Sequence, residues 1–133
     1  MNYESVYQTV KAKVEALVPT AAVHLPNEPP AENTALDIDV SVTETDSRPY
    51  TEIETKHHVS IDMLTSVPAS EGTERIHHIV SQLVTAFDPL QGGDFWTNDK
   101  KYFVGIQSVS QKQPSMADGR YQINVRILAV IQT

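Results

Sequence analysis

Hydrophobic residues recur at helical spacing in two segments of the chain. Over residues 3–18 they fall on one face of a helix, which is predicted to end before Pro19 because proline disfavours helical geometry at the residue that precedes it. The second segment opens at Ser70, a candidate N-cap, and closes before Pro89. Its apolar stripe is the strongest in the chain and consists of Ile76, Ile79, Val80, Leu83, Val84 and Phe87.

Elsewhere, hydrophobic and polar residues alternate, as in strands with one buried face. Asp118 and Gly119 supply turn residues between the last two strands. The polar residues 44–56 are predicted to form a loop with a turn at residues 48–50, and the proline-rich residues 25–30 to form an extended connector. The alternation predicts four strands, at residues 36–43, from residue 59 to a stop at Pro68, at 102–109 and at 121–131.

These elements follow one another in the order α-β-β-α-β-β, with no solenoid-type repeat. The order predicts an α+β fold in which helices pack on one face of a mixed, mostly antiparallel sheet. The chain has 133 residues, of which 40% are hydrophobic, so it is long enough to bury one core. A single domain over residues 1–133 is therefore expected.

The net charge of −7 comes from one stretch of the chain. Residues 28–62 contain nine carboxylates and only two cations, Arg48 and Lys56, whereas the remaining residues carry equal numbers of each sign. Gripping nucleic-acid phosphates requires clustered lysine and arginine, so this distribution argues against specific nucleic-acid binding. Two readings remain open: a solvated strand face, or a surface that repels DNA or meets a basic partner.

The chain contains no cysteine, which excludes a disulfide scaffold, a thiolate zinc site and a cysteine nucleophile. No apolar run approaches the roughly 18 residues that a membrane span needs. The first residues also lack the basic-then-apolar order of a signal peptide. These features predict a soluble, cytosolic protein without membrane contact.

Two adjacent histidine pairs are the first candidates for chemistry. Neither His57 and His58 nor His77 and His78 have the i, i+4 spacing with which two helical histidines share a zinc ion. A site built across elements from His58, His78 and Glu74 would make the protein a metal-dependent hydrolase. Boundary or solvent-facing histidines explain the same residues, so no metal site is assigned.

Carboxylates two residues apart are the second candidates. Asp37 with Asp39, and Glu52 with Glu54, would share one strand face at a separation within reach of paired acid–base chemistry. Such chemistry needs one member whose pKa is raised by burial, and nothing in the sequence indicates that burial. The sequence also lacks a nucleophile elbow, a P-loop and a dinucleotide fingerprint, so neither an enzyme nor a cofactor is predicted.

Phe95 and Trp96 follow the Gly92-Gly93 break. Such a large amphipathic pair can anchor a protein partner, or it can cover the edge of its own core.

Taken in order, these segments resemble the tail-terminator proteins of long-tailed, lambda-like bacteriophages. The resemblance spans nearly the whole chain and rests on a pattern of elements. The chain departs from the family pattern at residues 56–58, where members often have a glycine, and in its unusually acidic loop 43–56. The similar segments are the N-terminal helix, residues 23–29 as the family's strand-to-Pro-Asn segment, strands 36–40 and 59–63, Gly72 ahead of helix 76–87, and the hairpin of 103–109 with 121–131.

The resemblance implies a structural virion protein that acts after synthesis in the host cytoplasm. Six copies would form a ring at the head-proximal end of the tail, where the ring stops polymerisation of the tube. Its partners would be the major tail tube protein and a head-completion or neck protein, and DNA would pass through the ring. The candidate partner-binding residues are Asp46, Arg48, Tyr50, Glu52, Glu54, Phe95 and Trp96.

Three other functions remain open at this point. A neck or head-completion protein of the same assembly would bind the portal side instead. A metal-dependent hydrolase would hold a metal ion at His58 and His78. A small acidic binding module would stay monomeric and would bind a basic partner with marked salt dependence.

Overall fold

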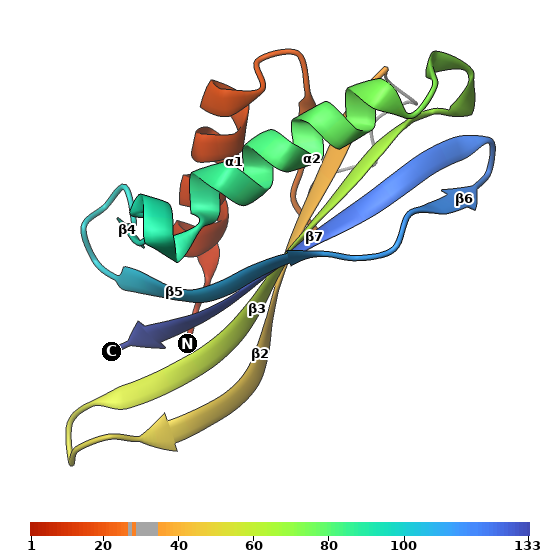
Figure 1. The fold of residues 1–133 in the computed structure, drawn as a ribbon. Coiled ribbons are helices and arrows are strands. Elements are labelled where there is room, and N and C mark those ends of the chain that lie inside the picture. The colour runs from red at the N-terminus through yellow and green to blue at the C-terminus, as the bar shows by residue number, and fades with distance from the viewer. Residues whose placement is uncertain (27, 29–34) are drawn as a thin grey trace.

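The computed structural model describes residues 1–26, 28 and 35–133. Both predicted helices and all four predicted strands are present, together with three further short strands (Figure 1). Along the chain the elements are α1 (Glu4–Leu17), β1 (Ala22–His24), β2 (Asp37–Pro49), β3 (Thr55–Pro68), the 3-10 helix η1 (Ala69–Glu71), α2 (Glu74–Phe87), the 3-10 helix η2 (Pro89–Gln91), β4 (Phe95–Trp96), β5 (Phe103–Gln111), β6 (Ser115–Ala117) and β7 (Arg120–Gln132).

One curled sheet contains all of the described strands. Its order is β1-β2-β3-β7-β5-β4, and β6 pairs with β7 outside this path. β1 and β2 are parallel, whereas every other pair is antiparallel. The α+β class and the mixed sheet are therefore confirmed.

The core lies between the two helices and the sheet, and both helices lie on the same side of the sheet in Figure 1. The helices contribute the apolar stripes that their spacing predicted, and alternate residues of the strands complete the core. The opposite sheet face carries polar and charged residues and is called the open face. The largest fully buried side chains include Leu36, Ile38, Ile61, Met63, Ile76, Leu83, Ile123, Ile127 and Ile131.

The start of α2 differs from the prediction. Ser70 lies in η1 and is not the N-cap, which is Thr73. Between these two residues the helical geometry is broken at Gly72, whose φ of 77° is readily adopted only by glycine. The turn at Asp118 and Gly119 is confirmed, because both residues have positive φ and they join the paired residues Ala117 and Arg120.

The predicted order α-β-β-α-β-β omits β1, β4 and β6, which have only two or three residues each. So short a strand contains too few positions for hydrophobic alternation to appear. The predicted connector at residues 25–30 falls partly outside the described residues, because residues 27 and 29–34 are not described.

The predicted polar loop at residues 44–56 is wrong. β2 continues to Pro49 and β3 begins at Thr55, so the turn spans only residues 50–54. Most side chains of this stretch are at least partly open to solvent on both faces of the hairpin. A strand that buries neither face needs no alternation of hydrophobic residues, which is why its sequence looks like a loop.

Candidate functional site

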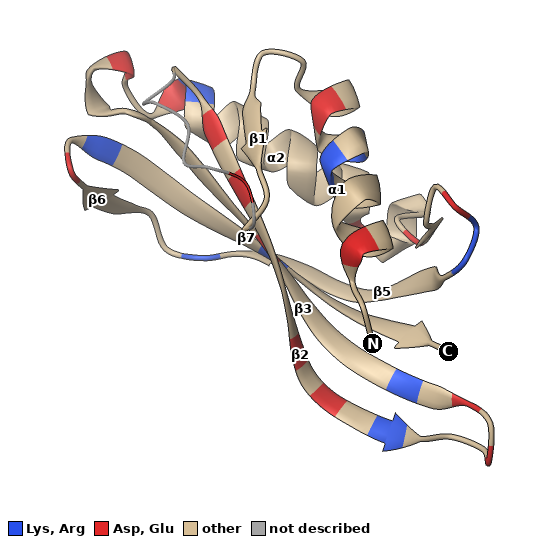
Figure 2. Ribbon diagram, turned by 180° about the vertical axis from the view of Figure 1, so that it is seen from behind, with Lys and Arg blue, Asp and Glu red and all other residues tan. Residues whose placement is uncertain are grey.

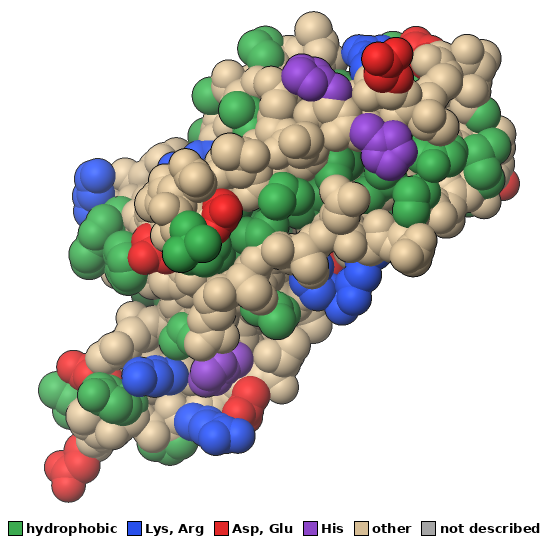
Figure 3. Space-filling model, in the orientation of Figure 1, with side chains coloured by type: hydrophobic (Ala, Val, Ile, Leu, Met, Phe, Trp, Pro, Cys, Tyr) green, Lys and Arg blue, Asp and Glu red, His purple; other side chains and the backbone are tan. Residues whose placement is uncertain are grey.

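The outer half of the β2–β3 hairpin, residues 44–56, projects beyond the body of the protein and is called the arm (Figure 1). The space-filling view shows it as a narrower lobe set off from the body (Figure 3). Acidic and basic positions follow one another along it (Figure 2). The structure thereby brings together five of the seven predicted partner-binding residues, which are Asp46, Arg48, Tyr50, Glu52 and Glu54.

The tip of the arm, residues 50–54, is an ordered turn. The Tyr50 N–H donates to the carbonyl oxygen of Glu54 at 2.8 Å, and the Thr51 hydroxyl accepts from the N–H groups of Ile53 and Glu54. The Lys56 ammonium lies 4.2 Å from the centre of the Tyr50 ring. At its end the turn presents Ile53, whose surface is 89% exposed. An apolar side chain is therefore held in solvent on a fixed turn.

The outer edge of β2 is blocked against the addition of another strand. The Tyr7 hydroxyl bonds both the N–H and the carbonyl of Val42, at 2.8 and 3.3 Å. Beyond a bulge between residues 44 and 46, the Asp46 carboxylate accepts from the Ser47 N–H at 2.9 Å, and Pro49 has no N–H to offer. Bulges, charges and proline are the usual protection of a sheet edge. The arm is therefore suited to contacts through its side chains.

The root of the arm is tied to Thr133, which follows β7, and it lies near Tyr3. The imidazole of His57 lies 2.6 Å from the Glu44 carboxylate and 3.2 Å from the Thr133 hydroxyl. Thr55 and Thr133 exchange two backbone hydrogen bonds of 2.9 Å. Burial, and next the nearby Glu44 charge, raise the pKa of Tyr3 to about 12, although the Tyr3 hydroxyl meets no partner with hydrogen-bond geometry among the described residues. These contacts fix the direction of the arm.

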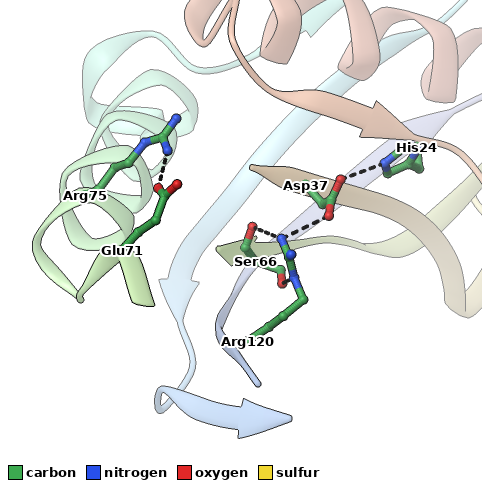
Figure 4. A network of polar contacts seen from close by, with 6 residues as sticks. All are labelled: His24, Asp37, Ser66, Glu71, Arg75 and Arg120. Atoms are coloured by element: carbon green, nitrogen blue, oxygen red, sulfur yellow. Dashed lines mark hydrogen bonds and ion pairs between the residues drawn. The ribbon is translucent and has the colours of Figure 1, made fainter. Parts of the chain in front are cut away.

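A buried polar network stabilises the far end of the open face (Figure 4). Arg120 of β7 donates to Asp37 of β2 at 3.0 Å and to the hydroxyl and carbonyl oxygens of Ser66 at 2.7 and 3.1 Å. The other Asp37 oxygen lies 3.1 Å from His24 of β1. The network thus joins four strands, and Asp37 serves as a structural ion-pair partner.

Asp37 and Asp39 share this face, as predicted, but their surroundings differ. Burial raises the pKa of Asp39 above its usual range, although much of its surface is open to solvent. No sequence pattern around Asp39 indicated this partial burial. Further along the face, burial also opposes ionisation of Asp62, yet hydrogen bonds from Asn124 and Arg126 outweigh it and leave the pKa of Asp62 lowered. The second predicted pair, Glu52 with Glu54, lies in the turn of the arm.

A notch of about 490 Å³ opens on the same face, between the arm and the edge strands β4 and β5. Phe103 and Val130 give it apolar walls, and Gly105 adds no side chain to its floor. Lys56 of the arm and His58 further along β3 border it. The notch therefore combines an apolar interior with charged groups at its rim.

Asp94 and Gln132 also border the notch, but each has a partner within the chain. Asp94 accepts a hydrogen bond of 2.7 Å from the N–H of Ile106, next to the bulge in β5. Gln132 donates to the carboxylate of Glu54. These contacts hold the rim in place.

Phe95 and Trp96 have different environments despite being neighbours in β4. Phe95 is buried and meets the Phe87 ring edge-on at 6.3 Å, so it belongs to the core. Trp96 is half exposed and packs against Phe103, with ring centres 5.4 Å apart. Trp96 and Phe103 thus form an aromatic surface beside the notch, and only Trp96 was predicted from the sequence. Phe103 opens its strand, where alternation alone does not indicate whether an aromatic ring is exposed.

The residues proposed for a metal site lie on different surfaces. His58 borders the notch, whereas His78 of α2 borders a separate hollow with Ser81 and Thr85. Glu74 is exposed at the start of α2. Within residues 1–26, 28 and 35–133, no group of three or more histidine, aspartate or glutamate side chains is arranged to hold a metal ion.

No protein-family model matches the sequence, and no curated protein matches it. Among the solved structures that are similar to this chain, one that carries no functional name matches over 100% of this chain and 97% of its own, with a TM-score of 0.72 and 16% sequence identity. At this identity the similarity supports the fold alone. Of the helices in the described part of the chain, none has the length and apolar character to span a membrane.

Proposed function

We propose that this protein is a structural subunit of a long-tailed phage, which caps the tail tube as a ring and offers the surface to which the head connects. The observation that carries the proposal is the arm. It is directed by contacts at its root, blocked along its edge and apolar at its tip. Such an arm contributes little to the core of its own chain, so a role in contacts with other subunits accounts for it.

Capping follows from the geometry of the contacts. A ring whose lower surface complements the last tube ring, and whose upper surface differs from it, ends the repeating series of identical contacts. The two faces of this chain are suited to such a role, because one side carries the helices and the other is the polar open face. We include in this proposal that the chain shares the fold of the tail-terminator family, with the same order of elements and with the helices packed on one face of the sheet.

The charge of the arm is consistent with a duct for DNA. Asp46 and Glu52 lie on the arm with Arg48, and the carboxylates are in excess over residues 28–62. A lumen lined by carboxylates does not retain a duplex, since like charges repel. The ring would pass DNA without binding it specifically.

The test combines mass and electron microscopy. The protein is co-expressed with the tail-tube subunit of the same genome, and the tubes are imaged by negative stain. Tubes that are shorter than those formed without the protein and that end in a ring are expected, together with an oligomeric mass for the ring. In a parallel co-expression with the portal protein, rings on portal assemblies would instead identify a neck protein. A monomer that binds only basic partners would identify a binding module.

Charge reversal on the arm sharpens the test. Asp46→Lys, Glu52→Lys and Glu54→Lys together should abolish capping while the fold persists. The matched control reverses three exposed helical carboxylates, Glu4→Lys, Glu15→Lys and Glu74→Lys, which changes the net charge equally. Normal capping by the arm variant would remove the arm from the proposal.

A further inference from the structure

The tip of the arm and the notch have complementary properties. The tip presents Ile53, with Glu52 exposed beside it. The notch offers the apolar walls of Phe103 and Val130, and the volume of about 490 Å³ accommodates an aliphatic side chain together with part of its turn. An exposed aliphatic side chain held on an ordered turn and a hollow with apolar walls are complementary in character.

The charges at the two surfaces also match. Glu52 at the tip has no basic partner among the described residues of its own chain, and Lys56 and His58 stand at the rim of the notch. Asp94 borders the notch as well, but one of its oxygens is held by the Ile106 N–H of β5. Such a charge pair at the rim of an interface sets orientation more than it adds affinity.

Ile53 and Glu52 of the tip cannot reach into the notch of their own chain, although Glu54 bonds to Gln132 at its rim. β2 and β3 remain paired as far as Pro49 and Thr55, and β3 is held on its other side by β7 as far as Lys56 and Gln132. This ladder keeps the tip pointing away from the body (Figures 1 and 3). Because the edge of β2 is blocked, the arm cannot dock by adding a strand either.

We infer that the tip of the arm of one copy inserts into the notch of the next copy, with Ile53 against Phe103 and Val130 and with Glu52 toward Lys56 and His58. Each copy then fills one neighbour's notch and offers its own notch to another. Such a head-to-tail contact closes into a ring when the rotation between copies allows it. The inference rests on the proposed ring and names the surfaces that would join its subunits.

The absence of cysteine allows the contact to be mapped by disulfide trapping. Ile53→Cys and Gln107→Cys are made in separate chains with tags of different mass, mixed at high concentration and oxidised. Gln107 is exposed and borders the notch. Mixed dimers are expected, at a yield at least tenfold above that from Ile53→Cys with Met116→Cys, an exposed control position on β6. The inference would be overturned if oxidation gave no mixed dimer, whether or not Ile53→Cys formed homodimers. Oxidation traps even brief encounters, so a real contact between positions 53 and 107 would be captured.

The double variant, with both cysteines in one chain, separates this contact from the ring itself. A series of disulfide-linked oligomers of increasing size supports both the contact and the ring. A product that stops at the dimer sustains the contact and overturns the ring. Rings seen by microscopy without a link between positions 53 and 107 overturn the contact and leave the ring standing.

Charge exchange provides the second measurement. Glu52→Lys in the tip chain, or Lys56→Glu in the notch chain, should each slow the trapping severalfold. Combining the two substitutions across the contact should restore the rate. If the two substitutions together did not restore the trapping rate, then Glu52 and Lys56 would not meet across the contact.

Discussion

The His57 imidazole and the Glu44 carboxylate lie 2.6 Å apart, across the two strands at the root of the arm. His57 is buried on the side of the sheet that faces the core, and its second nitrogen lies 3.2 Å from the Thr133 hydroxyl. One side chain thus links the two strands of the arm to the C-terminal residue. The direction of the arm depends on this link.

The stability of the protein should fall in acid because of Glu44. The hydrogen bond from His57 lowers the pKa of Glu44 from its ordinary value of 4.5. A carboxyl whose pKa is lower in the folded state stabilises the fold above its unfolded pKa, and this contribution is lost as the pH falls through the folded pKa. Between about pH 5 and about pH 3, the melting temperature of Glu44→Gln should therefore fall less than that of the unmodified protein.

Circular dichroism melts across this range measure the effect. Glu15→Gln, on the exposed side of α1, is the control and should follow the unmodified protein. Parallel curves for all three proteins would show that the link between Glu44 and His57 contributes no pH dependence.

Arg120 should be the most sensitive charged residue of the open face. Its guanidinium group contacts Asp37 and Ser66, and the side chains of Arg120 and Asp37 are 13% and 14% exposed. Arg120→Ala leaves the largely buried Asp37 without this cation, so unfolding in urea should show a loss of about 1.5–3 kcal/mol. Arg120→Lys keeps the charge but not the planar fork and should recover only part of the loss. Equal stability of both variants would contradict the role of the fork.

The sequence predicted those parts of the fold in which burial leaves a periodic pattern. Helix α2 and strand β7 each bury one face, so their residues alternate at the period of their own geometry. The arm buries neither face, and the pattern was absent there although the strands are long. The candidate site follows the same rule. The acidic residues of the arm were found by their composition, whereas the notch unites Lys56, Phe103 and Val130 from three strands, and no local pattern records that pairing.

Gly93 should tolerate alanine less well than Gly92. A Cβ at Gly93 would lie 2.3 Å from the carbonyl oxygen of Phe87, a backbone atom that cannot move alone. Gly92 has open space around it, and its φ of 76° makes alanine cost only about 1–2 kcal/mol. Urea unfolding should therefore rank Gly93→Ala as the less stable variant. The opposite ranking would show that η2 shifts easily away from the end of α2.

The block along the edge of β2 should be what keeps the arm from joining other strands. In the variant Asp46→Thr with Pro49→Thr, the Ser47 N–H loses its carboxylate partner, position 49 gains an N–H, and both new residues favour strands. The variant should keep its fold but form β-sheet aggregates at concentrations at which the unmodified protein stays dispersed. Light scattering and thioflavin fluorescence measure this change.

Pro114→Thr is the matched control for the proline, because it adds an N–H in the exposed segment between β5 and β6 and leaves β2 unchanged. It should stay dispersed. If the double variant is as well dispersed as the control and still forms rings, then the bulge between residues 44 and 46 and the Tyr7 contact at Val42 suffice to block the edge. If instead the double variant aggregates but its rings still assemble, then strand addition and ring contacts use different surfaces, as expected for an arm that docks through the side chains of its tip.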